Sequence, residues 1–162
     1  MDENISRTCC FTGHRPEKLQ LTEHATQDAL KQEILRAAGD GFFTFISGMA
    51  RGTDIIAAEE VLKMRDEGMP LRLVCASPFF GFERGWSGRW KKRYSDVLAR
   101  AEEVFFICPG YIHGCYQKRN IWMVDRSGLV IAVYAGEQGG TENTISYAQK
   151  KGVEVRIIPA FT

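Results

Sequence analysis

The segment Phe45-Ile-Ser-Gly-Met-Ala-Arg-Gly-Thr-Asp-Ile-Ile-Ala-Ala-Glu59 is the most informative part of the chain. It begins with apolar residues typical of a buried strand, turns through Gly48 and Gly52, and continues as a helix that opens at Thr53 or Asp54. A strand that turns through glycines into a helix presents free backbone N–H groups and the positive end of the helix dipole. The segment therefore predicts a strand–loop–helix unit whose loop suits a phosphate or another anion.

Strand-like and helix-like segments alternate along the rest of the chain. The apolar runs predict strands over 7–12, 42–47, 71–76, 104–108, 129–134 and 153–158. The helical spacings predict helices over 22–38, 54–67, 89–101, 117–126 and 141–151. Thr22 is the expected N-cap of the first helix, and Pro78 is expected to close the third strand. This alternation is typical of an α/β fold, and we expect a Rossmann-like three-layer domain with a mostly parallel sheet.

Composition supports one globular domain. The 162 residues are a natural size for one core, and we expect residues 1–162 to form a single domain. The net charge of +1 argues neither for nor against nucleic acid. The five cysteines include no metal-type CxxC pair and predict buried thiols. No signal peptide or apolar run of about 20 residues is present, so we expect a cytoplasmic protein without membrane contact. We also expect no metal and no cofactor.

Two more strand-to-loop junctions resemble the first, at Thr12-Gly-His-Arg-Pro16 and at Gly139-Gly-Thr-Glu-Asn-Thr144. The carboxyl ends of parallel strands share one edge of a sheet, and ligands bind at that edge. Glycines let a backbone approach a ligand closely, and arginines pair with phosphate. The candidate ligand-binding residues are Gly13, His14, Arg15, Ser47, Gly48, Arg51, Gly52, Asp54, Gly139, Gly140 and Thr141.

Each junction also has a purely structural explanation. Asp54 and Thr141 are good helix caps, and Arg15 is a surface residue fixed by the following proline. We favour ligand binding because three junctions of one kind share one sheet edge, while His14 is left between the two interpretations.

Catalytic motifs are sparse. The chain has no nucleophile elbow, no P-loop and no metalloprotease motif, and the candidate catalytic carboxylates are Glu142 and Asp54. The aromatic residues of the segment 79–90 are expected to form a small core beneath a loop rather than a wall for a base or sugar ring. The basic residues of 89–93, with Lys118 and Arg119, are either solvated helix faces or a surface that attracts an anion.

The segment Ser47-Gly-Met-Ala-Arg-Gly-Thr-Asp54 resembles the S-G-x-A-x-G-x-D motif of the Smf/DprA branch of the SLOG superfamily, which also includes the LOG phosphoribohydrolases. The similarity extends from about residue 8 to 159 and is greatest to a group of uncharacterised bacterial and phage proteins that includes YpsA-like proteins. The other matching segments are Thr12–Pro16, Ala76–Phe79, Lys92–Tyr94, Gln117–Asn120, Met123–Asp125 and Gly139–Thr141 with Asn143.

The resemblance implies a Rossmann-like fold, a pocket for nucleotides or their derivatives, and frequent dimers. The LOG enzymes carry P-G-G-x-G-T-x-x-E with a catalytic Glu, whereas this chain lacks the Pro before Gly139 and has Thr144 three positions after Thr141. This departure argues against phosphoribohydrolase activity.

The leading hypothesis is binding or sensing of a nucleotide-like small molecule at the carboxyl edge of the sheet, by a protein that could form homodimers. One alternative is an enzyme that hydrolyses an N-glycosidic or phosphate bond of a nucleotide. Another is single-stranded nucleic-acid binding through the basic residues of 89–93 and 118–119 and the stacking surfaces of Trp86 and Trp90.

Overall fold

The computed structural model describes residues 3–160, which are built around one six-stranded sheet. All neighbouring strands are parallel, in the order β4-β3-β2-β1-β5-β6. The strands are β1 (Thr8–Gly13), β2 (Thr44–Ser47), β3 (Arg72–Phe79), β4 (Glu103–Cys108), β5 (Leu129–Tyr134) and β6 (Glu154–Pro159). The helices are α1 (Glu3–Ser6), η1 (Pro16–Lys18), α2 (Glu23–Gly39), α3 (Thr53–Asp66), α4 (Gly88–Arg100), α5 (Cys115–Asp125) and α6 (Gly140–Lys150).

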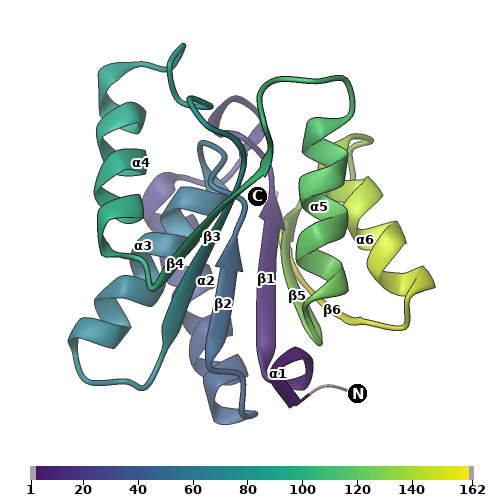
Figure 1. Cartoon of the computed structure of the whole chain (residues 1–162). Helices are drawn as coiled ribbons and strands as arrows, with labels where there is room; N and C mark the ends of the chain where they lie inside the picture. Colours follow the sequence, from purple (N-terminus) through teal and green to yellow (C-terminus); the bar gives the residue numbers. More distant parts are fainter. Residues whose placement is uncertain (1–2, 161–162) are drawn as a thin grey trace.

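Helices cover both faces of the sheet, which gives three layers (Figure 1). One core lies under α2, α3 and α4, and a second lies under α5 and α6. Successive residues of β1 point into alternate cores, since Cys9 and Phe11 belong to the first and Cys10 to the second. A strand buried on both faces needs mainly apolar residues, which is why β5 is a continuous apolar run and β1 is apolar from Cys9 to Phe11.

The predicted α/β, Rossmann-like fold is confirmed, and each predicted strand and helix is present within a few residues of its expected bounds. Thr22 caps α2 as expected, because its Oγ1 accepts the Ala25 N–H at 3.0 Å. Pro78 does not end β3, which continues to Phe79. At that level β2 has already ended, and the register leaves Pro78 without a partner in β4, so its missing N–H removes no ladder bond.

The strand order reverses at β1, which has β2 on one side and β5 on the other. In open α/β sheets such a switch point is the usual ligand position. The register places Gly13 at the end of β1 beside Val133 of β5. The loops that follow these two strands therefore leave the sheet together.

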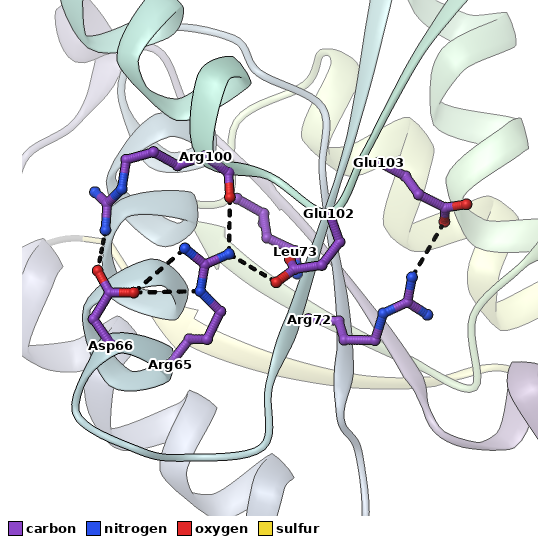
Figure 2. A network of polar contacts seen from close by, with 7 residues as sticks. All are labelled: Arg65, Asp66, Arg72, Leu73, Arg100, Glu102 and Glu103. Carbon is purple, nitrogen blue, oxygen red and sulfur yellow. Dashed lines mark hydrogen bonds and ion pairs between the residues drawn. The ribbon is translucent and has the colours of Figure 1, made fainter.

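A polar network ties the opposite edge of the sheet together (Figure 2). Glu102 accepts the Leu73 N–H at 2.6 Å and pairs with Arg65 at 2.7 Å, so one carboxylate joins α3 to the starts of β3 and β4. Arg65 also donates to the Arg100 carbonyl at the end of α4. The network fixes the end of the molecule that lies away from the switch point.

The five cysteines are free and buried, as the sequence predicted. Within residues 3–160, no helix has the length and apolarity needed to cross a membrane. The same residues contain no group of three or more His, Cys, Asp or Glu side chains placed to hold a metal ion.

Candidate functional site

A cavity of about 350 Å³ opens at the switch point, where the loops after β1 and β5 meet α3 and α5. We call it the main cavity. This volume falls at the small end of the range for ligand pockets. Its lining includes Gly13, His14, Arg15, Lys18, Ala50, Asp54, Phe82, Tyr116, Arg119, Asn120, Gln138, Gly139, Gly140 and Thr141.

All three predicted junctions contribute to this lining. The contributing predicted residues are Gly13, His14, Arg15, Asp54, Gly139, Gly140 and Thr141. The structure therefore brings together residues from positions as distant as 13 and 141, as the shared-edge argument predicted.

Ser47, Gly48 and Gly52 do not line the main cavity but support its floor. Ser47 is fully buried, and its Oγ donates to the Asp54 carbonyl at 2.8 Å and accepts the Met49 N–H at 3.2 Å. A Cβ on Gly48 would lie 2.9 Å from the Arg119 guanidinium, and one on Gly52 would lie 2.8 Å from the His14 carbonyl oxygen. Gly48 therefore leaves room for Arg119, and Gly52 leaves room for the loop that contains His14. Both glycines face protein atoms rather than the cavity.

Arg51 lies in a smaller adjoining chamber of about 170 Å³, which we call the annex. The annex is lined by Arg15, Ala50, Arg51, Phe82, Gly85, Trp86 and Tyr116. Four of these residues, Arg15, Ala50, Phe82 and Tyr116, also line the main cavity, so the two chambers adjoin. Arg51 is paired with Glu17 at 2.6 Å, which partly neutralises its charge.

Asp54 is a buried carboxylate with one oxygen unused. Its Oδ2 accepts the Ala50 N–H at 3.2 Å, whereas its Oδ1 is buried without a hydrogen-bond partner. Asp54 does not cap α3, because it is the second residue of the helix and Gly52 occupies the N-cap. Burial raises the pKa of Asp54 to about 6, against the opposing effects of Arg119, the Ala50 N–H and Arg15.

Arg119 lies across the main cavity from the loops, on α5, and only 6% of its surface is exposed. It donates to the Gly48 carbonyl and to Asn120 Oδ1, the latter at 3.0 Å. Burial lowers the pKa of Arg119, while the charge of Asp54 opposes that shift. The cavity therefore holds a buried cation, Arg119, and a buried carboxyl group, Asp54, whose Oδ1 makes no hydrogen bond. Such groups are good anchors for a polar ligand.

His14 is buried, and its Nε2 accepts the Ala135 N–H at 3.0 Å. Because Nε2 is the acceptor, the neutral ring carries its proton on Nδ1. Burial lowers the pKa of His14, although Glu137 acts in the opposite direction. His14 thus has a clear structural role, which is to tie the loop after β1 to the loop after β5.

The N-terminus of α6 forms one wall of the main cavity. Gly139 occupies the N-cap position, and no side chain caps the helix. Thr141 is the second residue of the helix, so it is not the cap that the sequence suggested. A Cβ placed on Gly139 or Gly140 would meet nothing within 4 Å. The free N–H groups and positive dipole of this turn face the cavity side of the molecule, where an anion is stabilised.

Other sequence candidates lie elsewhere. Glu142 is absent from the lining of both chambers, so Asp54 is the candidate carboxylate that the structure places in the site. Arg89 and Arg93 pair with Glu23, and Arg93 also pairs with Glu59. Trp90 is buried beneath these two arginines, so both guanidinium groups are paired with carboxylates and the ring is not free to stack on a base.

The candidate site residues from the sequence did not include Arg119, Tyr116 and Asn120, and Arg119 was considered only as part of a basic surface that attracts an anion. All three belong to α5, a helix that the sequence placed correctly but whose cavity-facing side it could not assign. The available signal was the segment Gln117–Asn120, which already contributed to the family resemblance.

Comparison with protein families gives a match over residues 9–159 to YpsA, described as the YspA SLOG family. The chain belongs to this SLOG family. The chain is 32% identical over 120 residues to the uncharacterised SPbeta prophage-derived protein YoqJ of Bacillus subtilis (strain 168), covering 67% of this chain and 70% of YoqJ. It is 27% identical over 158 residues to a UPF0398 protein of Bacillus thuringiensis (strain Al Hakam), covering 92% of this chain and 85% of that protein.

Two solved structures of DNA processing protein A share the fold of this SLOG family member. The Helicobacter pylori protein, studied for its single-stranded DNA binding mode, aligns with a TM-score of 0.65 and 21% identity, over 94% of this chain and 65% of that chain. The Streptococcus pneumoniae protein aligns with a TM-score of 0.69 and 16% identity, over 95% and 50%. This chain thus spans about two thirds and half of the two DprA chains, and at these identities the likeness concerns the fold.

Proposed function

We propose that the main cavity binds a nucleotide or a nucleotide-derived small molecule. The observation that carries the proposal is the meeting of four groups in one cavity at the switch point: the N-terminus of α6, Arg15, the buried Arg119, and Asp54 with its unpartnered Oδ1. Cations and free N–H groups suit a phosphate, whereas an unused carboxyl oxygen suits a hydroxyl or amine of a sugar or base. A nucleotide supplies both kinds of group.

Arg15 is the residue best placed to test the proposal. It lines the main cavity and the annex, and among the described residues it makes no ion pair with a carboxylate within 4.0 Å. Its guanidinium lies 5.9 Å from the ring centre of Tyr116. A cation without a carboxylate partner at the mouth of a cavity is available to a phosphate.

The proposal is tested by isothermal titration calorimetry with nucleoside mono-, di- and triphosphates, NAD and ADP-ribose. We expect at least one of these compounds to bind, with about tenfold or greater weakening in Arg15→Ala. Arg89→Ala is the matched control, because Arg89 is an exposed arginine outside both chambers. No binding by any compound, or equal affinity in the wild type and Arg15→Ala, would refute the proposal.

A second candidate is hydrolysis of an N-glycosidic or phosphate bond in the bound nucleotide. The observation that favours it is Asp54, whose pKa of about 6 suits an acid or base at neutral pH. Product analysis of each ligand that binds tests this activity. Turnover that disappears in Asp54→Asn, while binding persists, would support it, and an absence of products would limit the protein to binding or sensing.

Single-stranded DNA binding remains the third candidate, suggested by the DprA fold. The arginine surface of α4 is already paired with carboxylates, so we expect at most weak binding that depends steeply on salt. Fluorescence anisotropy of a labelled oligonucleotide measures this binding between about 50 and 200 mM salt, a range over which electrostatic binding to DNA changes strongly. Tight binding that persists at the higher salt would contradict this expectation.

A further inference from the structure

The annex sits beside the main cavity and has a different chemistry. Three aromatic residues line it: Phe82, Trp86 and Tyr116. Phe82 packs against Trp86 with ring centres 5.0 Å apart and against Tyr116 at 5.7 Å. Two arginines, Arg15 and Arg51, complete the lining. The main cavity, by contrast, places a buried carboxyl group and the N-terminus of α6 around its ligand space.

The annex is too small to be a complete ligand site. Its volume of about 170 Å³ lies below the range of ligand pockets, which begins at about 300 Å³. It shares Arg15, Phe82 and Tyr116 with the main cavity, so a molecule held in one chamber extends naturally into the other. The space and its ring-lined walls suit a single flat group.

Phe82 and Trp86 have two roles, because they pack against the first core and also line the annex. Phe82, Gly85 and Trp86 come from the glycine- and aromatic-rich segment between β3 and α4. Trp86 also packs edge-on against Tyr94 at 5.4 Å, which anchors it to α4 while it still lines the annex. The loop is therefore held in place by the core, with an aromatic wall facing the chamber.

Arg15 lines both chambers, so a phosphate bound to it would lie between a group in the main cavity and a group in the annex. A phosphate at Arg15 has the main cavity on one side and the annex on the other. Arg51 supplies a second guanidinium on the annex side, although its pairing with Glu17 reduces its charge.

We propose that the annex is a second subsite, which receives a ring-bearing group attached beyond the phosphate of the nucleotide in the main cavity. This inference rests on the proposed nucleotide function. The ligand class is therefore two ring-bearing groups joined through phosphate. Such a ligand comes from two sources, a pyrophosphate-linked small molecule or a phosphodiester-linked strand, and base stacking on aromatic side chains serves either.

Calorimetry with three probes tests the inference: AMP, the pyrophosphate-linked diadenosine diphosphate (AppA) and the phosphodiester-linked dinucleotide pApA. We expect AppA or pApA to bind the wild-type protein at least about tenfold more tightly than AMP, as one stacked base provides. Trp86→Leu should remove this advantage and leave the affinity for AMP within about twofold. Trp86→Tyr, which keeps a ring, should retain most of the advantage.

Trp122→Leu is the matched control, because Trp122 packs against Phe105 on the other side of the sheet and lines neither chamber. It should leave all three affinities unchanged. Circular dichroism and thermal unfolding check that every variant folds.

The outcomes separate the two proposals. AMP binding with no advantage for either larger probe, or an advantage that survives in Trp86→Leu, overturns the annex and leaves the nucleotide function intact. No binding of any probe overturns both. An advantage for AppA alone assigns the small-molecule source, and an advantage for pApA alone assigns the strand.

Discussion

Asp54 and Gly52 lie two positions apart in the sequence but have different roles. Asp54 gives the cavity an unused carboxyl oxygen at the cost of burying an ionisable group, whereas Gly52 lets the loop before α3 pass close to the loop after β1. Gly52 has a φ of +87°, a conformation that residues with a Cβ rarely adopt. One residue thus serves the ligand space and the other serves the packing beneath it.

At the residue scale, Asp54→Asn should change how stability depends on pH. The pKa of Asp54 is raised in the folded protein to about 6, above its unfolded value near 3.8. Between these values the folded state holds a proton that the unfolded state has lost, so this group's contribution is present below pH 4 and lost as pH rises through 6. The loss is about 3 kcal/mol.

Urea unfolding at pH 4 and pH 7.5 measures this effect. Asp54→Asn should be close to wild type at the lower pH and more stable than wild type at the higher pH. A constant difference between the two proteins at both pH values would contradict the assignment.

Gly52→Ala should destabilise the fold. Alanine rarely adopts the φ of +87° found here, and its Cβ would lie 2.8 Å from the His14 carbonyl oxygen, so we expect a loss of about 2 kcal/mol or more. Gly140→Ala is the matched control, since a Cβ there meets nothing within 4 Å and alanine favours a helix. Chemical denaturation compares the two variants, and equal stabilities would show that the close approach at Gly52 is unimportant.

At the scale of elements, the sheet is fastened at its far edge by side chains that reach between elements. Glu102 accepts a backbone N–H from β3 and a guanidinium from α3, whereas its neighbour Glu103 makes only a long contact with Arg72 at 3.8 Å (Figure 2). The Glu102 carboxylate is partly desolvated, yet the Leu73 N–H and Arg65 hold its pKa below the usual value. Two adjacent glutamates therefore differ in what they stabilise.

We expect Glu102→Ala to cost about 1–2 kcal/mol, because it leaves the Leu73 N–H without its acceptor and leaves Asp66 as the remaining carboxylate partner of Arg65. Glu103→Ala should change stability by less than about 0.5 kcal/mol, as for other exposed pairs. Urea denaturation at neutral pH measures both. Similar losses in the two variants would indicate that the contacts of Glu102 have no special weight.

At the scale of the whole molecule, β4 is an edge strand with no neighbour on its outer side among the described residues. Figure 1 shows it at the front of the sheet, between α4 and α5. Phe105 and Phe106 on this strand are 40% and 41% exposed. An open apolar edge readily pairs with another strand. A second copy offers the same strand, and antiparallel pairing about a two-fold axis would place Phe105 or Phe106 opposite itself.

We therefore predict a homodimer through β4. Light scattering after gel filtration should give a mass near twice 18.3 kDa. Phe106→Glu should shift the protein towards monomer because it places two charges at the paired edge. Tyr111→Glu, at an exposed aromatic outside the strand, is the control. A monomeric wild type at all accessible concentrations would refute the dimer.

The chain order of strands and helices was readable from local patterns, because burial on both faces demands apolar runs and helical spacing marks one buried side. The same logic located the ligand edge, since parallel strands bring their carboxyl ends together and the glycine junctions at residues 13, 48 and 139 follow such ends. These properties depend on neighbours in sequence and on the general geometry of sheets.

The identity of the cavity wall depended on the tertiary structure. Arg119 enters the site because α5 packs beside β3 and β4, a contact between distant segments that no local pattern records. Gly48 and Gly52 face protein atoms, whereas Gly139 and Gly140 have open space, although all four look alike in the sequence. The sequence determined which kinds of residue reach the edge, and the packing of distant segments determined which of them face the ligand space, because direction and burial are set by contacts across the fold.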